Sequence, residues 1–219
     1  VPCERNAHPH ISAGLAVVHN GIIENHESLR KHLRAMGYVF VSDTDTEVVA
    51  HLIAHELKTT ADFLSAVRQA IAQLQGAYAI AVLRESEPER LVVAREGAPL
   101  LLGLSNDGCY AASDASALVQ VTRRMVYLEN GDCAELMRDG YRIIRVDGTP
   151  VERPESESQL SAEAIELGNY RHYMQKEIFE QPVAVANTLE MLGMARSLQP
   201  GIFGAESEST LDEVGQVLI

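Results

Sequence analysis

The sequence contains little of several residue types, and each shortage excludes a class of protein. Among its 219 residues there is no Trp, there are only three Cys, and 5% of the residues are aromatic. Three cysteines, with no C-x-x-C pair, argue against a disulfide framework and for a reducing, cytoplasmic compartment. No apolar run approaches the roughly 18 to 20 residues that a membrane-spanning helix needs, so we expect no membrane segment.

Positive charge is also scarce. The chain carries 18 Lys and Arg against 31 Asp and Glu, which gives a formal net charge of −13. Binding to a nucleic-acid backbone needs a surplus of Lys and Arg, so we expect no nucleic-acid partner. The 46% of hydrophobic residues suits a globular protein, and the length suits one domain with an additional segment.

The first third of the sequence has the apolar spacing of helices. Asn25 is expected to cap a helix that ends at Gly37, and residues 38–41 form a short predicted strand. Thr44 and Glu47 match a capping box that opens a second helix. A third helix is predicted over about 61–75. The apolar faces of the three helices are Leu29, Leu33 and Met36, then Val48, Val49, Leu52, Ile53 and Leu57, and finally Phe63, Val67, Ile71 and Leu74.

The pattern then changes to short β-rich runs over 77–151, separated by turn dipeptides such as Asn130-Gly131. Helices followed by an antiparallel meander predict an α+β fold. We divide the chain into a domain over 1–151, a polar, acidic linker over 152–169 and a segment over 170–219. That last segment contains a helix predicted over about 182–196 and leads towards a further domain.

The stretch LAVVHNGIIEN, residues 15–25, carries the first candidate site. Asn20-Gly21 is typical of a hairpin turn. However, the residues after Gly21 do not alternate like a returning strand, and they lead into a helix. A strand that ends in Asn-Gly before a helix can present a side-chain amide and a backbone N–H side by side. Two fixed donors of this kind stabilise the oxyanion of an acyl-transfer intermediate.

Three further residue types could carry chemistry. Asp45 lies in the first turn of the second predicted helix, where the helix dipole favours an ionised carboxylate; it is either a solvated acid or a ligand for a substrate ammonium group. His51-x3-His55 has zinc-like spacing but departs from the H-E-x-x-H order, so a metal site is the less favoured interpretation. Nothing in the sequence places a base beside Cys3, which favours a structural or exposed thiol.

Several of these stretches occur together in one known family. They are ERNAHPH (4–10), VVHNGIIENHESLR (17–30), GYVFVSDTDTEVVAHL (37–52) and YRHYMQKEIFEQP (170–182). Together they resemble the family of glutamine–fructose-6-phosphate aminotransferases. The first and third stretches are shared with other class II glutamine amidotransferases. The fourth is more particular to the aminotransferases, where it joins the glutaminase domain to the sugar-isomerase half.

The resemblance implies an N-terminal-nucleophile hydrolase fold, a four-layer αββα sandwich. In this family the Cys that begins the mature protein attacks the amide of L-glutamine. The released ammonia passes to fructose-6-phosphate and gives glucosamine-6-phosphate, with no metal or nucleotide cofactor. By position, Asn20 and Gly21 match the oxyanion hole, and Asp45 matches the acid that binds the α-amino group of glutamine. Gly21 also lines the glutamine pocket in the family, and His8 fits a position near it.

The sequence also departs from the family pattern. The family begins with Cys-Gly-Ile, whereas this chain begins with Val1-Pro2, and its last residues, GQVLI, fall where the family enters a sugar-isomerase domain. We therefore expect a fragment truncated at its N-terminus, inactive alone, whose unpaired strand edges promote a homodimer or larger assembly. A non-catalytic glutamine-binding module is one alternative, and a His-rich metallohydrolase is an alternative of a different class.

Overall fold

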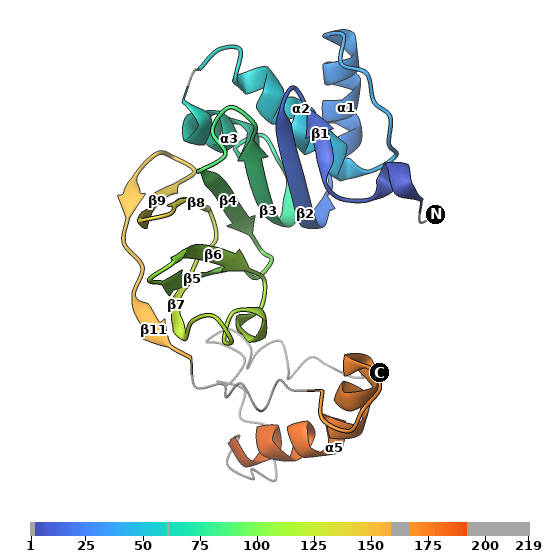
Figure 1. The fold of residues 1–219 in the computed structure, drawn as a ribbon. Helices are drawn as coiled ribbons and strands as arrows, with labels where there is room; N and C mark the ends of the chain where they lie inside the picture. The colour runs from blue at the N-terminus through green and yellow to red at the C-terminus, as the bar shows by residue number, and fades with distance from the viewer. Residues whose placement is uncertain (1–2, 61, 159–166, 192–219) are drawn as a thin grey trace, which may run out of the picture. The chain divides into compact units, whose positions relative to one another are not determined.

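The computed structural model describes residues 3–60, 62–158 and 167–191, with side chains described up to residue 185 (Figure 1). The chain forms two compact units, Val1–Ile165 and Glu166–Ile219. The elements of the first unit are η1 (Glu4–Asn6), β1 (His10–Ser12), β2 (Leu15–Ile23), α1 (His26–Ala35), α2 (Asp45–Glu56), α3 (Phe63–Ile71), β3 (Gly76–Arg84), β4 (Leu91–Glu96), β5 (Leu101–Ser105), β6 (Gly108–Ala112), η2 (Ala115–Ala117), β7 (Arg124–Tyr127), β8 (Asp132–Met137), β9 (Gly140–Arg145), β10 (Pro150–Val151) and β11 (Glu155–Glu157).

The strands of the first unit form two sheets. The larger has the order β1-β2-β3-β4-β8-β9-β10, and the smaller has the order β11-β7-β5-β6. Every ladder between these strands is antiparallel, and most strands pair with a neighbour in the sequence. The first unit therefore runs from strands β1 and β2 through helices α1, α2 and α3 into an antiparallel meander. This confirms the predicted α+β class.

The layers of the sandwich follow from where apolar residues gather. One core, which includes Leu15 and Phe63, lies between the helices and the larger sheet. A second core, which includes Leu102 and Val126, lies between the two sheets. On the outer face of the smaller sheet, Leu118 after η2 packs over a third, smaller cluster. The described residues therefore build helices, sheet and sheet in succession, with α2 and α3 on one side of the larger sheet (Figure 1).

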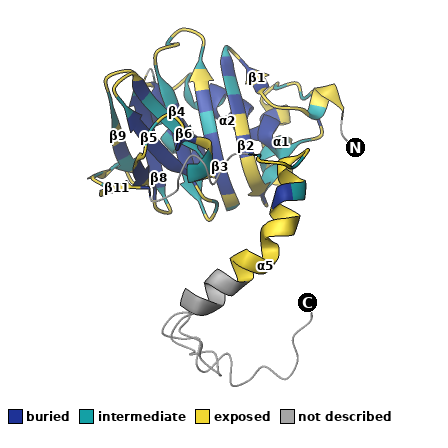
Figure 2. Cartoon of the chain, turned by 60° about the horizontal axis from the view of Figure 1, so that its bottom comes forward, coloured by how far each residue is buried: buried dark blue, intermediate teal, exposed yellow. Residues whose placement is uncertain are grey.

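Helix α2 is buried on nearly all sides. It contacts α1, α3, β1 and β2, and its residues from Thr46 to Ala54 are all buried (Figure 2). Three of these buried residues are polar, namely Thr46, Glu47 and His51. Burying a polar group costs free energy unless it finds a hydrogen-bond partner. The surroundings of α2 must therefore supply partners, and they come from the residues before the helix and from β1 and β2.

The helix ends differ from the sequence prediction in two places. Asn25 stands at the N-cap of α1, but its side chain does not cap that helix. Its Nδ2 donates to the carbonyl of Gln73 at 2.8 Å, and its Oδ1 accepts from the amide of Gln75 at 3.0 Å. Asn25 therefore ties the end of β2 to the connection before β3. Helix α3 ends at Ile71, earlier than predicted, and Gly76 begins β3 instead of ending the helix.

The segment before α2 also differs from its prediction. Residues 38–41 were predicted to form a strand, but they pair with no other strand in the part of the chain that the structure describes. The predicted capping box between Thr44 and Glu47 is wrong as well. The carboxylate of Glu47 accepts from the amides of Val41 and Ser42, further back along the chain than the N-cap. A fully buried carboxylate takes the donors that surround it, and here these lie in the preceding turn.

The predicted linker over 152–169 begins inside the fold. Glu155–Glu157 forms β11, which pairs with β7 in the smaller sheet. Just before it, Arg153 donates to both carboxylate oxygens of Asp132 at 2.8 Å and contacts Glu129 at 2.8 Å. Because the Asp132 side chain is fully buried, this two-bond contact anchors the chain where it passes from the larger sheet to the smaller one.

The second unit contains one described helix, α5 (Tyr173–Met191). Its start is earlier than the predicted helix over 182–196, whose end lies outside the described residues, and Pro182 stands inside it. From Tyr173 to Val185 nearly all of its residues are exposed (Figure 2). None of the described helices combines the length and the apolarity that crossing a bilayer requires.

The anchor at Asp132 makes a stability prediction. Arg153→Met removes the cation and leaves a fully buried carboxylate without its charged partner, which should lower the free energy of unfolding by about 3 kcal/mol. Arg124→Met is the matched control, because the Arg124–Glu155 pair is exposed on both sides and should matter little. Urea unfolding followed by circular dichroism measures both. Equal effects of the two substitutions would contradict the assigned role of Arg153.

Candidate active site

One edge of β2 is open over its second half. Strand β1 pairs only with Leu15–Val17, so among the described strands Val18–Ile23 has β3 on one side and no strand on the other. At the end of this stretch the amide of Glu24 donates to Gln75 beside β3, while the amide of Ile23 donates to the carboxylate of Asp45 at 2.9 Å. Successive amides of a strand point to opposite sides. The amide of Gly21 therefore faces the same open edge as the amide of Ile23.

Asn20 and Gly21 lie within β2 and not at its end. Asn20 pairs with Ala79 and Gly21 pairs with Tyr78 in the ladder with β3. A two-residue reversal at Asn20-Gly21 is therefore excluded, and the prediction that the strand ends there is wrong, because β2 continues to Ile23. Side chains alternate between the two faces of a strand. His19 is buried and contacts Thr46 of α2, so the exposed side chain of Asn20 lies on the opposite face of β2, away from the helices.

Glycine is required at position 21. Its φ is +126°, and a Cβ placed there would lie 2.1 Å from the carbonyl oxygen of Ala77. Gly76, which pairs with Ile23 on the same ladder, has φ +118° and would place a Cβ 2.2 Å from the carbonyl oxygen of Ile22. Two close backbone approaches in one ladder give this part of β2 a shape that other residues cannot adopt.

Asp45 brings a negative charge to the same edge. It is the first residue of α2, where unpaired amides and the helix dipole favour a carboxylate. Its Oδ2 accepts from the amide of Ile23, and its Oδ1 lies 3.9 Å from Nδ1 of His19. Asp45 therefore meets β2 two residues beyond Gly21, on the side to which the amide of Gly21 points. The structure brings these two predicted site residues to one edge.

His8 lies beside this group through Thr46. Nε2 of His8 is 3.3 Å from the hydroxyl of Thr46, and Nδ1 of His19 is 3.2 Å from the same hydroxyl. His8 is exposed, whereas the side chain of His19 is 2% exposed and its Nε2 has no hydrogen-bond partner among the described residues. Neither His19 nor Thr46 is among the site residues predicted from the sequence. Their neighbours Asn20 and Asp45 were the only signal that could have identified them.

The histidines that suggested zinc have other partners. Nδ1 of His51 lies 2.8 Å from the hydroxyl of Ser12, and Nε2 lies 3.1 Å from the carbonyl oxygen of Val39. The rings of His51 and His55 both contact Tyr38. Among the described residues, no group of three or more His, Cys, Asp or Glu side chains could hold a metal ion. The arrangement gives the metallohydrolase alternative no support.

The described cysteines are all free. Cys3 is exposed and Cys109 is half-buried. Cys133 is completely buried in the core between the helices and the larger sheet, and burial raises the pKa of its thiol to about 12. Cys3 is therefore the most accessible of the three thiols.

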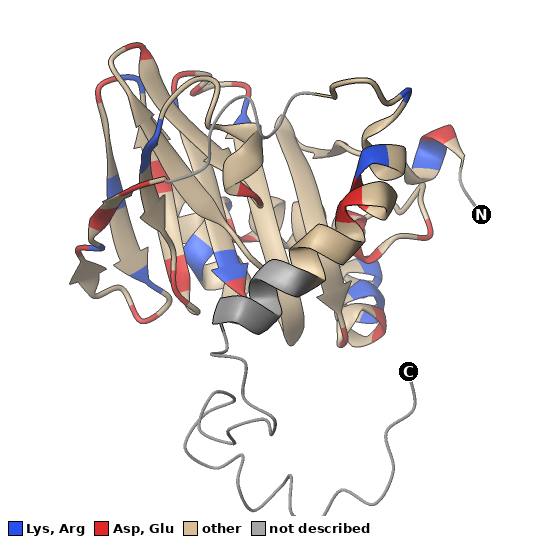
Figure 3. Ribbon diagram, turned by 90° about the horizontal axis from the view of Figure 1, so that it is seen from below, with Lys and Arg blue, Asp and Glu red and all other residues tan. Residues whose placement is uncertain are grey.

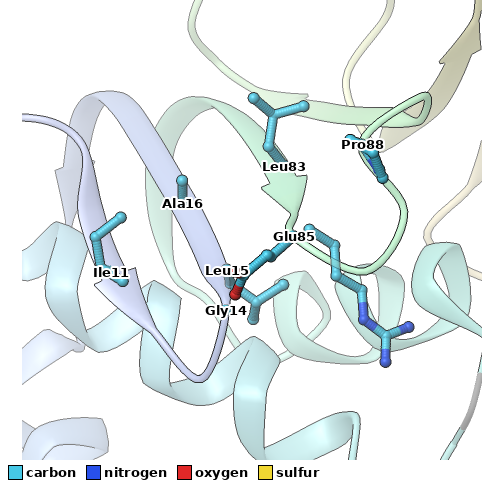
Figure 4. A pocket seen from close by; sticks show the side chains of 8 residues that line it. Ile11, Gly14, Leu15, Ala16, Leu83, Glu85 and Pro88 are labelled. Atoms are coloured by element: carbon cyan, nitrogen blue, oxygen red, sulfur yellow. The ribbon is translucent and has the colours of Figure 1, made fainter.

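The surface has hollows away from this edge. One, of about 340 Å³, lies at the turn between β1 and β2, where Ile11, Ala16, Leu83 and Pro88 line it (Figure 4). It is mostly apolar and lies at the opposite end of β2 from Gly21. A binding site normally adds a few convergent polar groups to an apolar hollow. The charged residues that line this hollow are Arg84, which pairs with Glu87, and Glu85. At the Gly21 end, by contrast, Asp45, Thr46 and His19 lie together.

Comparison with known proteins defines the class. The family model described as the glutamine amidotransferase domain matches residues 2–120, and the chain belongs to this family. The fold is also that of solved relatives. The glutamine phosphoribosylpyrophosphate amidotransferase of B. subtilis, solved with ADP and GMP, superposes with a TM-score of 0.50 at 26% identity, over 71% of this chain and 33% of that one. A glutamine aminotransferase class-II domain protein from Silicibacter pomeroyi gives 0.52 at 21% identity, over 68% and 74%.

The curated relatives carry a name that is more specific than that of the family. The glutamine–fructose-6-phosphate aminotransferase (isomerizing) of Xanthomonas campestris pv. campestris is 51% identical over 99% of this chain and 36% of that protein. The protein of the same name from Acidithiobacillus ferridurans is 58% identical over 85% of this chain and 31% of that protein. The chain thus spans about a third of the length of these relatives. The predicted resemblance and the predicted N-terminal-nucleophile fold class are confirmed.

Substitution at Gly21 tests the geometry of β2. Gly21→Ala should lower the free energy of unfolding by at least about 2 kcal/mol, because the methyl group would overlap the carbonyl of Ala77 and the positive φ would be strained. Gly131→Ala is the control, since Gly131 also has a positive φ (+80°) but a Cβ there meets nothing within 4 Å. Thermal or urea unfolding compares the two. A smaller loss at Gly21 than at Gly131 would contradict the close approach.

The buried histidines predict a pH dependence of stability. Burial lowers the pKa of His10, His19 and His51 in the folded protein. The unfolded chain therefore binds more protons just below the ordinary histidine pKa, so the free energy of unfolding should fall as the pH drops from about 7 to 5. The slope should not exceed roughly 1.4 kcal/mol per pH unit for each histidine. Urea unfolding at successive pH values measures it, and His51→Asn should make the slope shallower.

Proposed function

We propose that the chain forms the glutamine-binding part of a glutaminase site, and that the parent protein makes glucosamine-6-phosphate from L-glutamine and fructose-6-phosphate. The observation that carries this proposal is the open edge of β2, where the amide of Gly21 and the carboxylate of Asp45 come together next to Asn20. High identity to the named aminotransferases supports the particular substrates.

In this proposal Asn20 and Gly21 form the oxyanion hole. When a nucleophile attacks the side-chain amide of glutamine, the carbonyl oxygen gains negative charge. The Asn20 side-chain amide and the Gly21 N–H donate hydrogen bonds to that oxygen, and they do so most strongly in the transition state. Because Gly21 is held in a conformation that only glycine adopts, its N–H is fixed before the reaction starts.

Asp45 binds the other end of the substrate. Its carboxylate, held by the amide of Ile23, accepts the α-ammonium group of glutamine. His8 contacts Thr46, the residue after Asp45. In this proposal His8 also contacts the bound amino acid. These residues bind and orient glutamine but supply no attacking atom. The attacking thiol is that of the N-terminal Cys which the family resemblance implies, and Cys3 is assigned no part in the reaction.

The wider predictions for the parent protein rest on the same family relationship. We place the glutaminase domain over 1–151, the connection over 152–169 and the approach to a sugar-isomerase domain over 170–219, with the linker anchored at its start by Arg153. A cytoplasmic location, the absence of any cofactor and assembly into a homodimer or larger complex stay predictions. Lys and Arg in Figure 3 are interspersed with Asp and Glu over the described residues, which favours no nucleic-acid partner.

The proposal is tested in the protein expressed from its full reading frame. Asn20→Ala should lower kcat for glutamine hydrolysis by roughly 100-fold to 1,000-fold, because one oxyanion donor is lost. Asp45→Asn should mainly raise KM for glutamine, because it removes binding common to the ground state and the transition state. Product formation from added ammonia should survive both substitutions.

Asn130→Ala provides the matched control. Asn130 also precedes a Gly, but it lies in a turn where its Oδ1 accepts from Arg95 and Gly97. Its substitution should leave the kinetics of glutamine hydrolysis unchanged. If Asn20→Ala behaves like Asn130→Ala, or if it also abolishes synthesis from ammonia, the proposed site is wrong.

A further inference from the structure

The turn before Asp45 is held by a buried carboxylate. Glu47, the third residue of α2, is 2% exposed. Its Oε1 accepts from the amide of Val41 at 2.8 Å, and its Oε2 accepts from the amide of Ser42 at 2.7 Å and the hydroxyl of Ser42 at 2.6 Å. All three donors belong to the chain segment that leads into the helix. Glu47 therefore binds the turn and not the end of its own helix.

The backbone carbonyl groups of the same turn are also held by hydrogen bonds. The guanidinium of Arg30, on α1, donates to the carbonyl oxygens of Ser42, at 2.9 Å, and of Thr44. The hydroxyl of Thr44 contacts the hydroxyl of Ser42 at 2.9 Å and Nε2 of His10 at 3.0 Å. The segment Val41–Thr44 thus lies between a buried anion and a cation. Glu47 accepts from the N–H groups of Val41 and Ser42, and Arg30 donates to the C=O groups of Ser42 and Thr44. Hydrogen bonds to charged groups of this kind are the stronger ones.

The network keeps Glu47 ionised. Burial alone would raise the pKa of its carboxyl group, but the hydrogen bonds from Ser42 and Val41 outweigh burial and lower it. Nε2 of His51 lies 3.5 Å from Oε1 of Glu47 and adds to the same effect. A permanently charged carboxylate with three donors holds its partners in one geometry more firmly than a neutral group could.

This network fixes the position of Asp45. That residue follows Thr44 directly, and its own carboxylate reaches across to the amide of Ile23 on β2. The start of α2 is therefore fixed on one side by β2 and on the other by the clamped turn. Thr44 links the turn to Asp45, because its hydroxyl contacts that of Ser42 and only one peptide unit separates it from Asp45. A shift of the turn therefore moves the carboxylate of Asp45 relative to the β2 edge.

We propose that Glu47 is a positioning residue for glutamine, which fixes the carboxylate of Asp45 at the β2 edge by clamping Val41 and Ser42. This inference rests on the proposed function of Asp45 as the ligand of the substrate ammonium group. Glu47 does not touch the substrate. Its loss acts on binding, because Asp45 contacts the same ammonium group in the ground state and in the transition state, whereas the oxyanion donors on β2 remain in place.

The test compares Glu47→Gln with Glu56→Gln in the protein expressed from its full reading frame. Both substitutions remove one negative charge from α2, but Glu56 lies at the other end of the helix, where it accepts from Gln73. Glu47→Gln places an NH2 group against backbone donors and disrupts the clamp. We expect KM for glutamine to rise roughly tenfold with kcat changed less than about threefold. Glu56→Gln should leave both constants unchanged.

Ser42→Ala provides a second, milder variant. It removes only the hydroxyl that links Glu47 to Thr44 and leaves the two backbone donors. KM should rise by about two- to fourfold, and the double variant with Glu47→Gln should bind glutamine no more weakly than Glu47→Gln alone, because both act through one network. Ser42→Ala also decides the matter if Glu47→Gln does not accumulate as a folded protein: a raised KM supports the proposal, and an unchanged KM overturns it.

The outcomes separate this inference from the proposed function. If Glu47→Gln changes KM no more than Glu56→Gln does, or lowers kcat with KM unchanged, Glu47 does not position Asp45. The proposed function then still stands, provided that Asp45→Asn raises KM. If Asp45→Asn itself leaves KM unchanged, the proposed function of Asp45 fails, whatever Glu47→Gln shows.

Discussion

The hydrogen bond from the amide of Ile23 to the carboxylate of Asp45 is the contact on which the candidate site depends. It joins the open half of β2 to the first residue of α2. It is possible only because β1 stops pairing at Val17, which leaves the amides beyond it without a strand partner among the described residues. A longer β1 would use those amides for sheet ladders. The shortness of one strand therefore makes room for a site at the edge of the next.

The burial of α2 explains why so many polar side chains gather around its start. A helix enclosed by a sheet and two other helices excludes water from its first turns. Hydrogen bonds in such surroundings are electrostatically stronger than in water, and unpaired groups are correspondingly costly. Ser12 pairs with His51, and Ser42 pairs with Thr44 and Glu47. The hydroxyl of Thr46 pairs with His8 and His19. His51, which has zinc-like spacing in the sequence, serves here as a hydrogen-bond partner of Ser12 and Val39 in a water-poor region.

The sequence predicted element types well and pairing poorly. The helical spacing around Val48 and Leu52 and the meander after residue 77 are strong local signals, and both describe the fold correctly. Residues 38–41 alternate between half-buried and exposed, as a strand at a surface does, but no described strand pairs with them. The strand prediction failed because pairing depends on tertiary contacts. The capping box failed for a related reason. Position and residue type suggested that Glu47 would bind its own N-cap, but a buried carboxylate is placed by the donors around it.

The candidate site was predictable in its residues but not in its geometry. Asn20, Gly21 and Asp45 were identified from short motifs and a family resemblance. The open edge that brings the last two together depends on where β1 ends, and strand pairing of that kind is not encoded in any short stretch. The hydrogen bonds of Glu47 and Arg30 to the turn before α2 were not predicted, because a buried charge and a surface charge have the same appearance in a sequence.

The contrast between the three cysteines bears on how thiol chemistry can be used to study this protein. Reagents that alkylate sulfur react with the thiolate, so a thiol whose pKa is about 12 in a closed core reacts negligibly at neutral pH. Cys133 therefore contributes no background, whereas the exposed Cys3 competes for any electrophile aimed at a catalytic thiol. Counting of active centres by covalent labelling becomes quantitative only when Cys3 has been replaced by Ser.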